Sequence, residues 1–168
     1  MTRFAMRLLA LVMIAAIVGV LLETTVVHLL PLGPIMPDFV VILCVYLALH
    51  EHSVAGALGA FLLGYFVDNF SGDVLGLHAF AMSLIFVLVY LLARQLWMDN
   101  VFTNVAVVFG ASLLKAVSVA VLLALYVSGD YPWRHLFSTI WIEAGIAALA
   151  TPFVFSLLNG GRRVGGLE

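Results

Sequence analysis

Apolar residues dominate the chain in six runs, and short polar segments separate these runs. The runs cover residues 5–29, 38–50, 53–69, 77–94, 101–127 and 136–158. A helix that crosses a bilayer needs ~20 apolar residues, each adding about 1.5 Å. The pattern therefore predicts an all-α polytopic membrane protein with six transmembrane helices. We expect these helices to form one domain over residues 1–160, followed by a short cytoplasmic tail at 161–168.

The second and third runs are short for a full span. Residues 38–50 and 53–69 are separated by only a brief polar turn. Two arrangements fit this pattern. The two runs could form one helical hairpin that only just reaches each face of the bilayer, or two tilted segments of half length.

Composition supports the membrane interpretation. Apolar residues make up 65% of the 168 residues and charged residues 10%, whereas soluble domains carry ~25% charged residues. A water-soluble fold would lack the polar residues to cover its surface. The formal net charge of −2 offers no basic face for nucleic acid. These values exclude a soluble enzyme, a disordered chain and a nucleic-acid binder.

The distribution of arginine decides the predicted orientation. With six spans, both termini lie on one side of the membrane, and only Arg134 lies on the other. The arginines on the side of the termini are Arg3, Arg7, Arg94, Arg162 and Arg163. Cytoplasmic loops carry an excess of Lys and Arg, so we place both termini in the cytoplasm.

Small residues recur every four positions in the third run. Gly56, Ala60 and Gly64 form one stripe that leads to Asp68. Small residues at this spacing let helix backbones approach closely, which is the main source of helix association in lipid. The stripe is interpreted either as internal packing of the six helices or as a docking surface for the helix of a partner.

Lys115 lies in the middle of a predicted span, where an unpaired charge costs several kcal/mol. Helix rise places it roughly 21 Å along its span, and Glu143 and Asp68 roughly 22 Å along theirs from the same side. We therefore predict that Lys115 pairs with Glu143, with Asp68 as the next candidate. A structural ion pair, a polar cavity for a ligand or water, and a proton or ion pathway are the three interpretations.

Catalytic and metal-binding patterns are absent from the sequence. No GxSxG, HExxH or P-loop motif occurs. The five histidines fall near predicted interfaces or turns, as wetted interfacial side chains do. We expect no catalytic residue, no cofactor and no metal site.

The stretch from Met36 to Leu91 contains a series of residues that resembles one family, and the segment from Gly64 to Ser83 is its specific part. It includes Pro37, Asp38, Gly56, Gly59, Gly64, Asp68, Ser71, Gly72, Leu75, Gly76, Ala79 and the run Ala81-Met82-Ser83. With these residues the chain closely resembles the MreD family of bacterial rod shape-determining membrane proteins. The physical need for several of them is clear. Gly72 and Gly76 permit the positive φ of a tight turn, and Asp68 at a helix end can accept hydrogen bonds from backbone amides.

The resemblance implies a non-enzymatic subunit of the cell-elongation machinery in the bacterial inner membrane. Proteins of this family work with MreC, a single-span partner, and belong with MreB, the glycosyltransferase RodA and its partner transpeptidase. The implied role is to help maintain cell shape and to direct peptidoglycan synthesis.

A second implication leads to a different class of function. The six-helix arrangement of the family looks like the substrate-binding component of energy-coupling-factor transporters. The alternative function is therefore a membrane-embedded component that binds a small molecule or a lipid. This alternative expects a convergent polar pocket near Asp68, Lys115 and Glu143.

Overall fold

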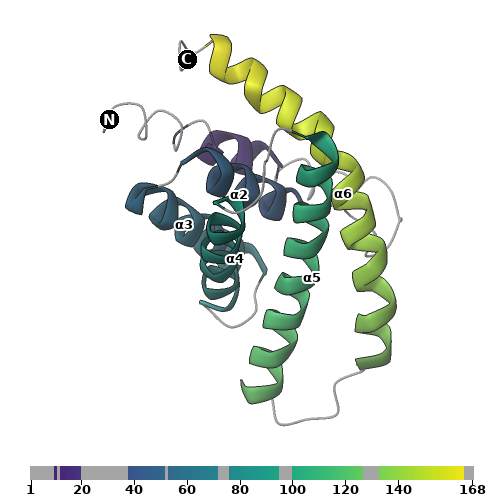
Figure 1. Ribbon diagram of the computed structural model, residues 1–168. Helices are drawn as coiled ribbons and strands as arrows, with labels where there is room; N and C mark the ends of the chain where they lie inside the picture. The colour runs from purple at the N-terminus through teal and green to yellow at the C-terminus, as the bar shows by residue number, and fades with distance from the viewer. Residues whose placement is uncertain are drawn as a thin grey trace.

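The protein is helical throughout the part of the chain that the computed structural model describes. These residues are 10, 12–19, 38–51, 53–71, 76–94, 100–126 and 133–164. Residues 12–19 are helical, and five labelled helices follow: α2 (Phe39–His50), α3 (Val54–Ser71), α4 (Leu77–Ala93), α5 (Val101–Tyr126) and α6 (Trp133–Val164). Figure 1 shows α2, α3 and α4 gathered on one side, with α5 and α6 side by side next to them.

Helix α2 is the centre of the fold. Every residue from Val40 to Ala48 is buried, and the helix contacts α3, α4, α5 and α6. Its apolar residues surround it on all sides, as expected for a core helix. Asp38 caps the N-terminus of the helix: its carboxylate accepts a hydrogen bond from Val41 N at 3.2 Å. Twelve residues extend only about 18 Å, which is shorter than the ~30 Å hydrocarbon core of a bilayer.

Helices α3 and α4 pack closely through the predicted small-residue stripe. A Cβ added at Gly64 would lie 2.4 Å from the carbonyl oxygen of His78 and 2.5 Å from Ala79 Cα. One added at Gly56 would lie 2.9 Å from the Phe86 ring. Ala60, between the two glycines, is fully buried. The stripe therefore serves internal packing, and α4 covers it.

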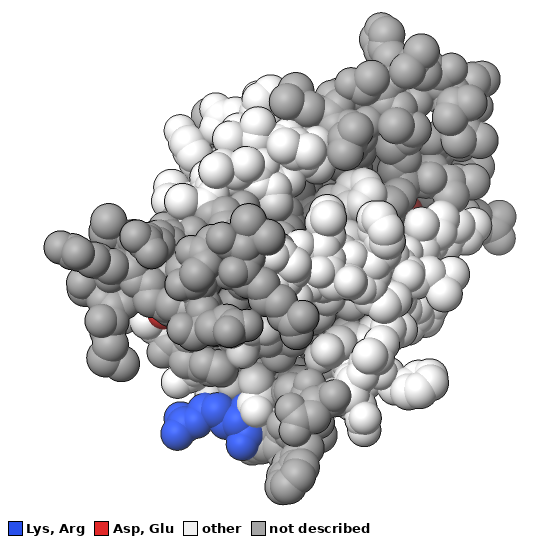
Figure 2. All heavy atoms as spheres, turned by 90° about the horizontal axis from the view of Figure 1, so that it is seen from above, with Lys and Arg blue, Asp and Glu red and all other residues white. Residues whose placement is uncertain are grey.

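Helices α5 and α6 are the two described helices that are long and apolar enough to cross a membrane. Their apolar windows are Val101–Leu122 and Ile140–Gly160. Large apolar side chains project from them, including Phe102, Leu149 and Phe153. Figure 2 shows a face whose described atoms are almost all neutral, with Lys or Arg at one edge.

The ends of α6 differ from the predicted span at 136–158. The helix begins at Trp133 and continues to Val164, through the predicted boundary at residue 160. Pro152 lies inside it, and Figure 1 shows the C-terminal part of α6 leaning away from the line of its first part. Proline removes one backbone hydrogen bond and bends a helix.

The number of membrane spans stays a prediction. Most of the first predicted span, at 5–29, lies outside the described residues, as do residues 165–168 of the predicted tail. α2, α3 and α4 are apolar but shorter than a full span. The expectation of helices near 38–50, 53–69 and 77–94 is confirmed, whereas a full crossing by each of them is not.

Candidate functional site

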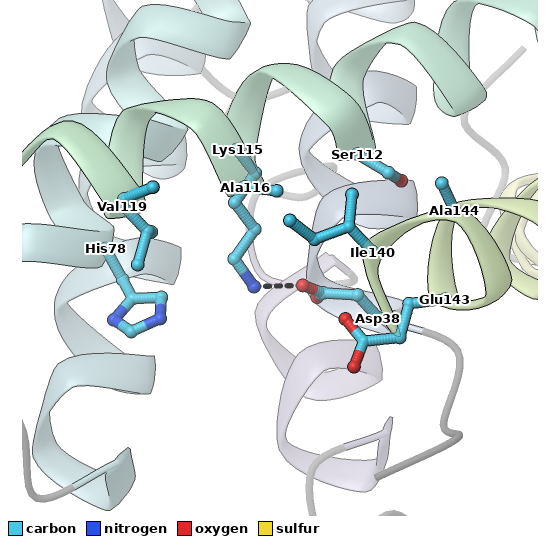
Figure 3. A pocket seen from close by; sticks show the side chains of 10 residues that line it. Asp38, His78, Ser112, Lys115, Ala116, Val119, Ile140, Glu143 and Ala144 are labelled. Carbon is cyan, nitrogen blue, oxygen red and sulfur yellow. Dashed lines mark hydrogen bonds and ion pairs between the residues drawn. The ribbon is translucent and has the colours of Figure 1, made fainter. Parts of the chain in front are cut away.

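A pocket with ionisable side chains on a largely apolar wall lies where the N-terminus of α2 meets α4, α5 and α6. Its volume is about 200 Å³. Four ionisable side chains from four parts of the chain line it: Asp38, His78, Lys115 and Glu143, from the start of α2, α4, α5 and α6 respectively. The remaining lining residues are Ser112, Ala116, Val119, Ala120, Ile140 and Ala144. We call this cavity the Lys115 pocket (Figure 3).

Lys115 forms its ion pair with Asp38. The ammonium donates to Asp38 Oδ2, and both side chains are only about one-fifth exposed (18% and 23%). The predicted pairing of Lys115 with Glu143, or next with Asp68, is therefore wrong in its acidic partner. Asp38 opens the predicted span at 38–50, and counting residues along the helices did not make it a candidate partner. Because α2 is short and central, its N-terminus lies next to Lys115.

Asp38 thus has two structural roles. Oδ1 accepts from the backbone N–H of Val41 and caps α2, while Oδ2 accepts from Lys115. The positive end of the helix dipole also stabilises a carboxylate at this position. These interactions compensate the charges of both side chains of the pair.

Glu143 lines the same pocket but has no ion-pair partner among the described residues. In Figure 3 its carboxylate lies beside Asp38, on the side away from the Lys115 ammonium. The Ser112 hydroxyl oxygen, also on the pocket wall, is buried and has no hydrogen-bond partner in the structure. Glu143 is half-buried, and the Ser112 oxygen lies beneath the pocket surface rather than in the cavity.

The turn between α3 and α4 is organised by Asp68. Its carboxylate accepts hydrogen bonds from the backbone N–H groups of Gly76, His78 and Ala79, at 3.0, 2.8 and 3.1 Å. Asp68 is almost completely buried, so these bonds replace its lost hydration. Gly76 has φ of +95°, as the predicted positive φ requires. The Asp68 side chain thus caps the start of α4 and joins it to the end of α3 across one turn.

The other predicted residues of this motif are described in part or not at all. Ser71 is the last residue of α3, and its side chain is outside the described residues. Pro37 and Gly72 also lie outside them. The role of these three residues stays a prediction.

His78 connects the Asp68 turn to the Lys115 pocket. Its Nδ1 lies 3.0 Å from Asp68 Oδ1, and its ring lines the pocket. The side chain is buried, which corrects its interpretation as a wetted interfacial residue. No periodic signal distinguishes it from the other histidines, because its burial depends on the close approach of α3 to α4.

A second polar cavity lies near the opposite end of the α5–α6 pair. It has a volume of about 590 Å³ and is lined by Val101, Asn104, Thr151, Pro152, Phe155, Ser156, Asn159 and Gly160. Tyr46 of α2 reaches this end and donates to Asn159 Oδ1 at 2.9 Å. His50 stacks on Tyr46, with ring centroids 4.1 Å apart. No binding role was predicted for these side chains from the sequence.

The described part of the chain contains no group of three or more His, Cys, Asp or Glu side chains that could hold an ion. Cys44 is buried inside α2, and its thiol donates to the Met82 carbonyl.

The fold and the pocket define a helical membrane protein with a small polar site between its helices. The family model described as rod shape-determining protein MreD matches residues 2–160, which is nearly the whole chain. The chain therefore belongs to the MreD family, and the predicted resemblance is confirmed. The family is a membrane protein family with a role in determining rod shape. No curated protein and no solved structure matches the chain.

Proposed function

We propose that this protein is a non-enzymatic scaffold subunit of the bacterial cell-elongation complex in the inner membrane. The match to the MreD family over residues 2–160 is the observation that carries this proposal. In this role the protein binds MreC, associates directly or indirectly with MreB, RodA and the partner transpeptidase, and helps direct peptidoglycan synthesis.

Exposed apolar faces support a role in holding other membrane proteins. The stripe of Gly56, Ala60 and Gly64 is covered by α4, so a partner must use another surface. On α5 and α6, Gly110 and Gly145 have nothing within 4 Å of an added Cβ. Open glycines on long apolar helices permit the close backbone approach that helix association in lipid requires.

Affinity purification of the full chain from its native membrane tests this proposal. We expect a single-span protein with a periplasmic domain, MreC, to copurify in stoichiometric amount. Gly110→Leu and Gly145→Leu form a matched pair of variants, because each adds bulk to an open face of one helix. Loss of MreC with one variant and not the other identifies the contacting helix, whereas recovery without any single-span partner overturns the proposal.

The proposed topology has six membrane segments with both termini in the cytoplasm. The arginine distribution supports it, since five arginines then lie inside and Arg134 outside. The test is thiol labelling of Leu167→Cys in a Cys44→Ala background. Labelling is expected only after the membrane is permeabilised, and labelling of intact cells would overturn the topology.

The Lys115 pocket favours a second candidate function, a membrane-embedded component that binds a small molecule or a lipid. Ionisable side chains from three helices and the cap of α2 converge on this cavity, and intramembrane ionisable residues commonly mark binding sites. Copurification of an ATPase module with a bound small molecule, in place of MreC, would favour this function over the scaffold.

A further inference from the structure

The Lys115 pocket brings ionisable side chains deep into the long apolar helices α5 and α6. Lys115 and Glu143 both lie within the apolar windows of these helices. Helix rise places Lys115 roughly 17 Å from Tyr126 at one end of α5 and roughly 21 Å from Val101 at the other. Acyl chains offer no hydrogen bonds, so a charged group at such a depth faces either other protein groups or a water-filled cavity.

Protein groups cover these side chains only in part. Lys115 and Asp38 bond to each other, yet 18% and 23% of their side-chain surfaces stay exposed. Glu143 is half-buried, and Figure 3 shows its carboxylate beside that of Asp38. An ammonium has three hydrogens to donate and a carboxylate has several lone pairs, so one ion pair leaves hydrogen-bonding capacity on both partners. Water can fill that capacity without any further protein group.

The cavity meets both physical conditions for holding water. Its volume of about 200 Å³ is far above the ~10–15 Å³ that a single water needs. A cavity stays dry when its lining is apolar throughout, whereas a buried water typically makes about three hydrogen bonds. Most of this wall is apolar, but Asp38, Lys115 and Glu143 place donors and acceptors together on it.

The pocket lies nearer to one end of the α5–α6 pair. Its lining residues on α5 share one helix face at i, i+3, i+4, i+7 and i+8; they are Ser112, Lys115, Ala116, Val119 and Ala120. Ala120 lies roughly 9 Å from Tyr126, where α5 ends. Ile140 lies roughly 10 Å from Trp133, where α6 begins. In the proposed topology, this end of the pair is at the periplasmic face.

We propose that the Lys115 pocket is a water-filled vestibule that opens to the periplasmic face of the membrane. Its hydration rests on the pocket alone, and the side on which it opens rests on the proposed topology. The vestibule also specifies the second candidate function. A ligand of this site enters from the aqueous phase, so it is a small water-soluble molecule in place of a lipid, and it is smaller than the drug-sized ligands of ~300–1,000 Å³ pockets.

Cysteine accessibility along α5 tests the proposal on the full chain in its native membrane. Cys44 is the single cysteine of the sequence, so Cys44→Ala provides a background without thiols. In this background Val119→Cys places a thiol on the pocket wall. Val117→Cys and Val121→Cys are the matched controls, because both positions are exposed outside the pocket and bracket residue 119 in depth.

Intact cells are treated with two membrane-impermeant methanethiosulfonate reagents, one cationic and one anionic, so that repulsion of one charge does not hide access. Thiols that remain are counted with a maleimide mass tag in SDS. The reactive thiolate forms in water and not in hydrocarbon, so we expect Val119→Cys to react more than about tenfold faster than both controls. Ala116→Cys, on the same face, should react in the same way and replaces Val119→Cys if that variant does not fold.

Three results would overturn the proposal. Slow reaction of the pocket thiols in both intact and permeabilised cells would mean that the pocket is dry. Equally fast reaction of the Val117→Cys and Val121→Cys controls would mean that the pocket has no access of its own. Reaction of the pocket thiols only after permeabilisation, with Leu167→Cys also labelled only then, would mean that the pocket opens to the cytoplasm.

The same labelling separates this proposal from the others. Pocket thiols that need permeabilisation, together with Leu167→Cys labelled in intact cells, would overturn the topology and support a vestibule at the end where α5 meets α6. Recovery of MreC is a separate measurement. The scaffold role can therefore fail while the vestibule remains, and the reverse.

Discussion

The α3–α4 turn and the α5–α6 pair differ in how many of their buried polar groups have a hydrogen-bond partner within the protein. At the turn, the Asp68 carboxylate receives three backbone hydrogen bonds and the His78 ring within one buried cluster. Along α5 and α6, the buried oxygens of Ser112 and Asn104 have no partner in the structure. Both residues line cavities to which α5 and α6 contribute. The carboxylate at the turn is therefore fully hydrogen-bonded by nearby backbone, whereas two buried oxygens of α5 have no partner in the described structure.

The glycines show the same contrast. Gly56 and Gly64 lie against α4 or the preceding turn so closely that a Cβ would clash. Gly110 and Gly145 face open space. Close packing in α2, α3 and α4 leaves no room for change, whereas α5 and α6 retain surfaces that other molecules can occupy.

The largest expected effect comes from Gly64→Leu. Backbone atoms of His78 and Ala79 would lie within 2.7 Å of the new Cβ, and backbone cannot move aside as a flexible side chain can. We expect loss of the α3–α4 contact and a fall in the free energy of unfolding of more than about 3 kcal/mol. SDS titration in mixed micelles measures this fall in the free energy of unfolding. Gly110→Ala is the control and should be neutral or slightly stabilising.

Lys115→Met should have the next largest effect. It leaves the buried Asp38 carboxylate without its cation, which costs about 3–5 kcal/mol for a broken buried pair. The double variant Lys115→Met, Asp38→Asn should recover much of this loss, because no uncompensated charge remains. Equal losses in the single and double variants would show that the pair does not contribute as an ion pair.

Asp68→Asn should destabilise the turn less severely. An amide keeps one acceptor oxygen but cannot accept from Gly76, His78 and Ala79 together. We expect a loss of about 1–3 kcal/mol, the cost of leaving buried donors unsatisfied. Hydrogen exchange at the first residues of α4 should increase, while exchange in α5 should not change. A uniform increase across all helices would contradict a local capping role.

Tyr46→Phe should have the smallest effect. It removes one hydrogen bond, from the Tyr46 hydroxyl to Asn159 Oδ1, and keeps the ring contacts with His50 and Phe155. We expect the free energy of unfolding to fall by about 1 kcal/mol. A loss as large as that of Lys115→Met would mean that this end of α6 depends on the α2 contact more than one bond explains.

The sequence predicted local elements well because hydrophobic runs and turn residues act at short range. Helices near 38–50, 53–69, 77–94 and 101–127 are observed within a few residues of the expected ends. Gly76 has the expected positive φ, and Asp68 accepts from backbone amides. Each of these features depends on residues close together in the chain, so the spacing of residues along the sequence is enough to predict it.

The partner of Lys115 could not be predicted by the same means. Counting residues gives the depth of a side chain along its helix but not the direction in which it points or which helix faces it. Asp38 becomes the partner because α2 is packed in the centre with its N-terminus below the surface of the protein. The burial of His78 has a similar origin, since it results from the tight contact of α3 with α4 at Gly64.

The amino-acid sequence by itself determined that this is a helical membrane protein, where most helices begin and end, and that it belongs to the MreD family. These properties follow from apolar periodicity, turn chemistry and motif residues, which are local. Only the tertiary structure decided that α2 is a buried core helix, that Asp38 neutralises Lys115, and that Glu143 and Ser112 line one pocket. Those properties depend on which helix faces meet, and side-chain contacts between residues distant in the sequence set that arrangement.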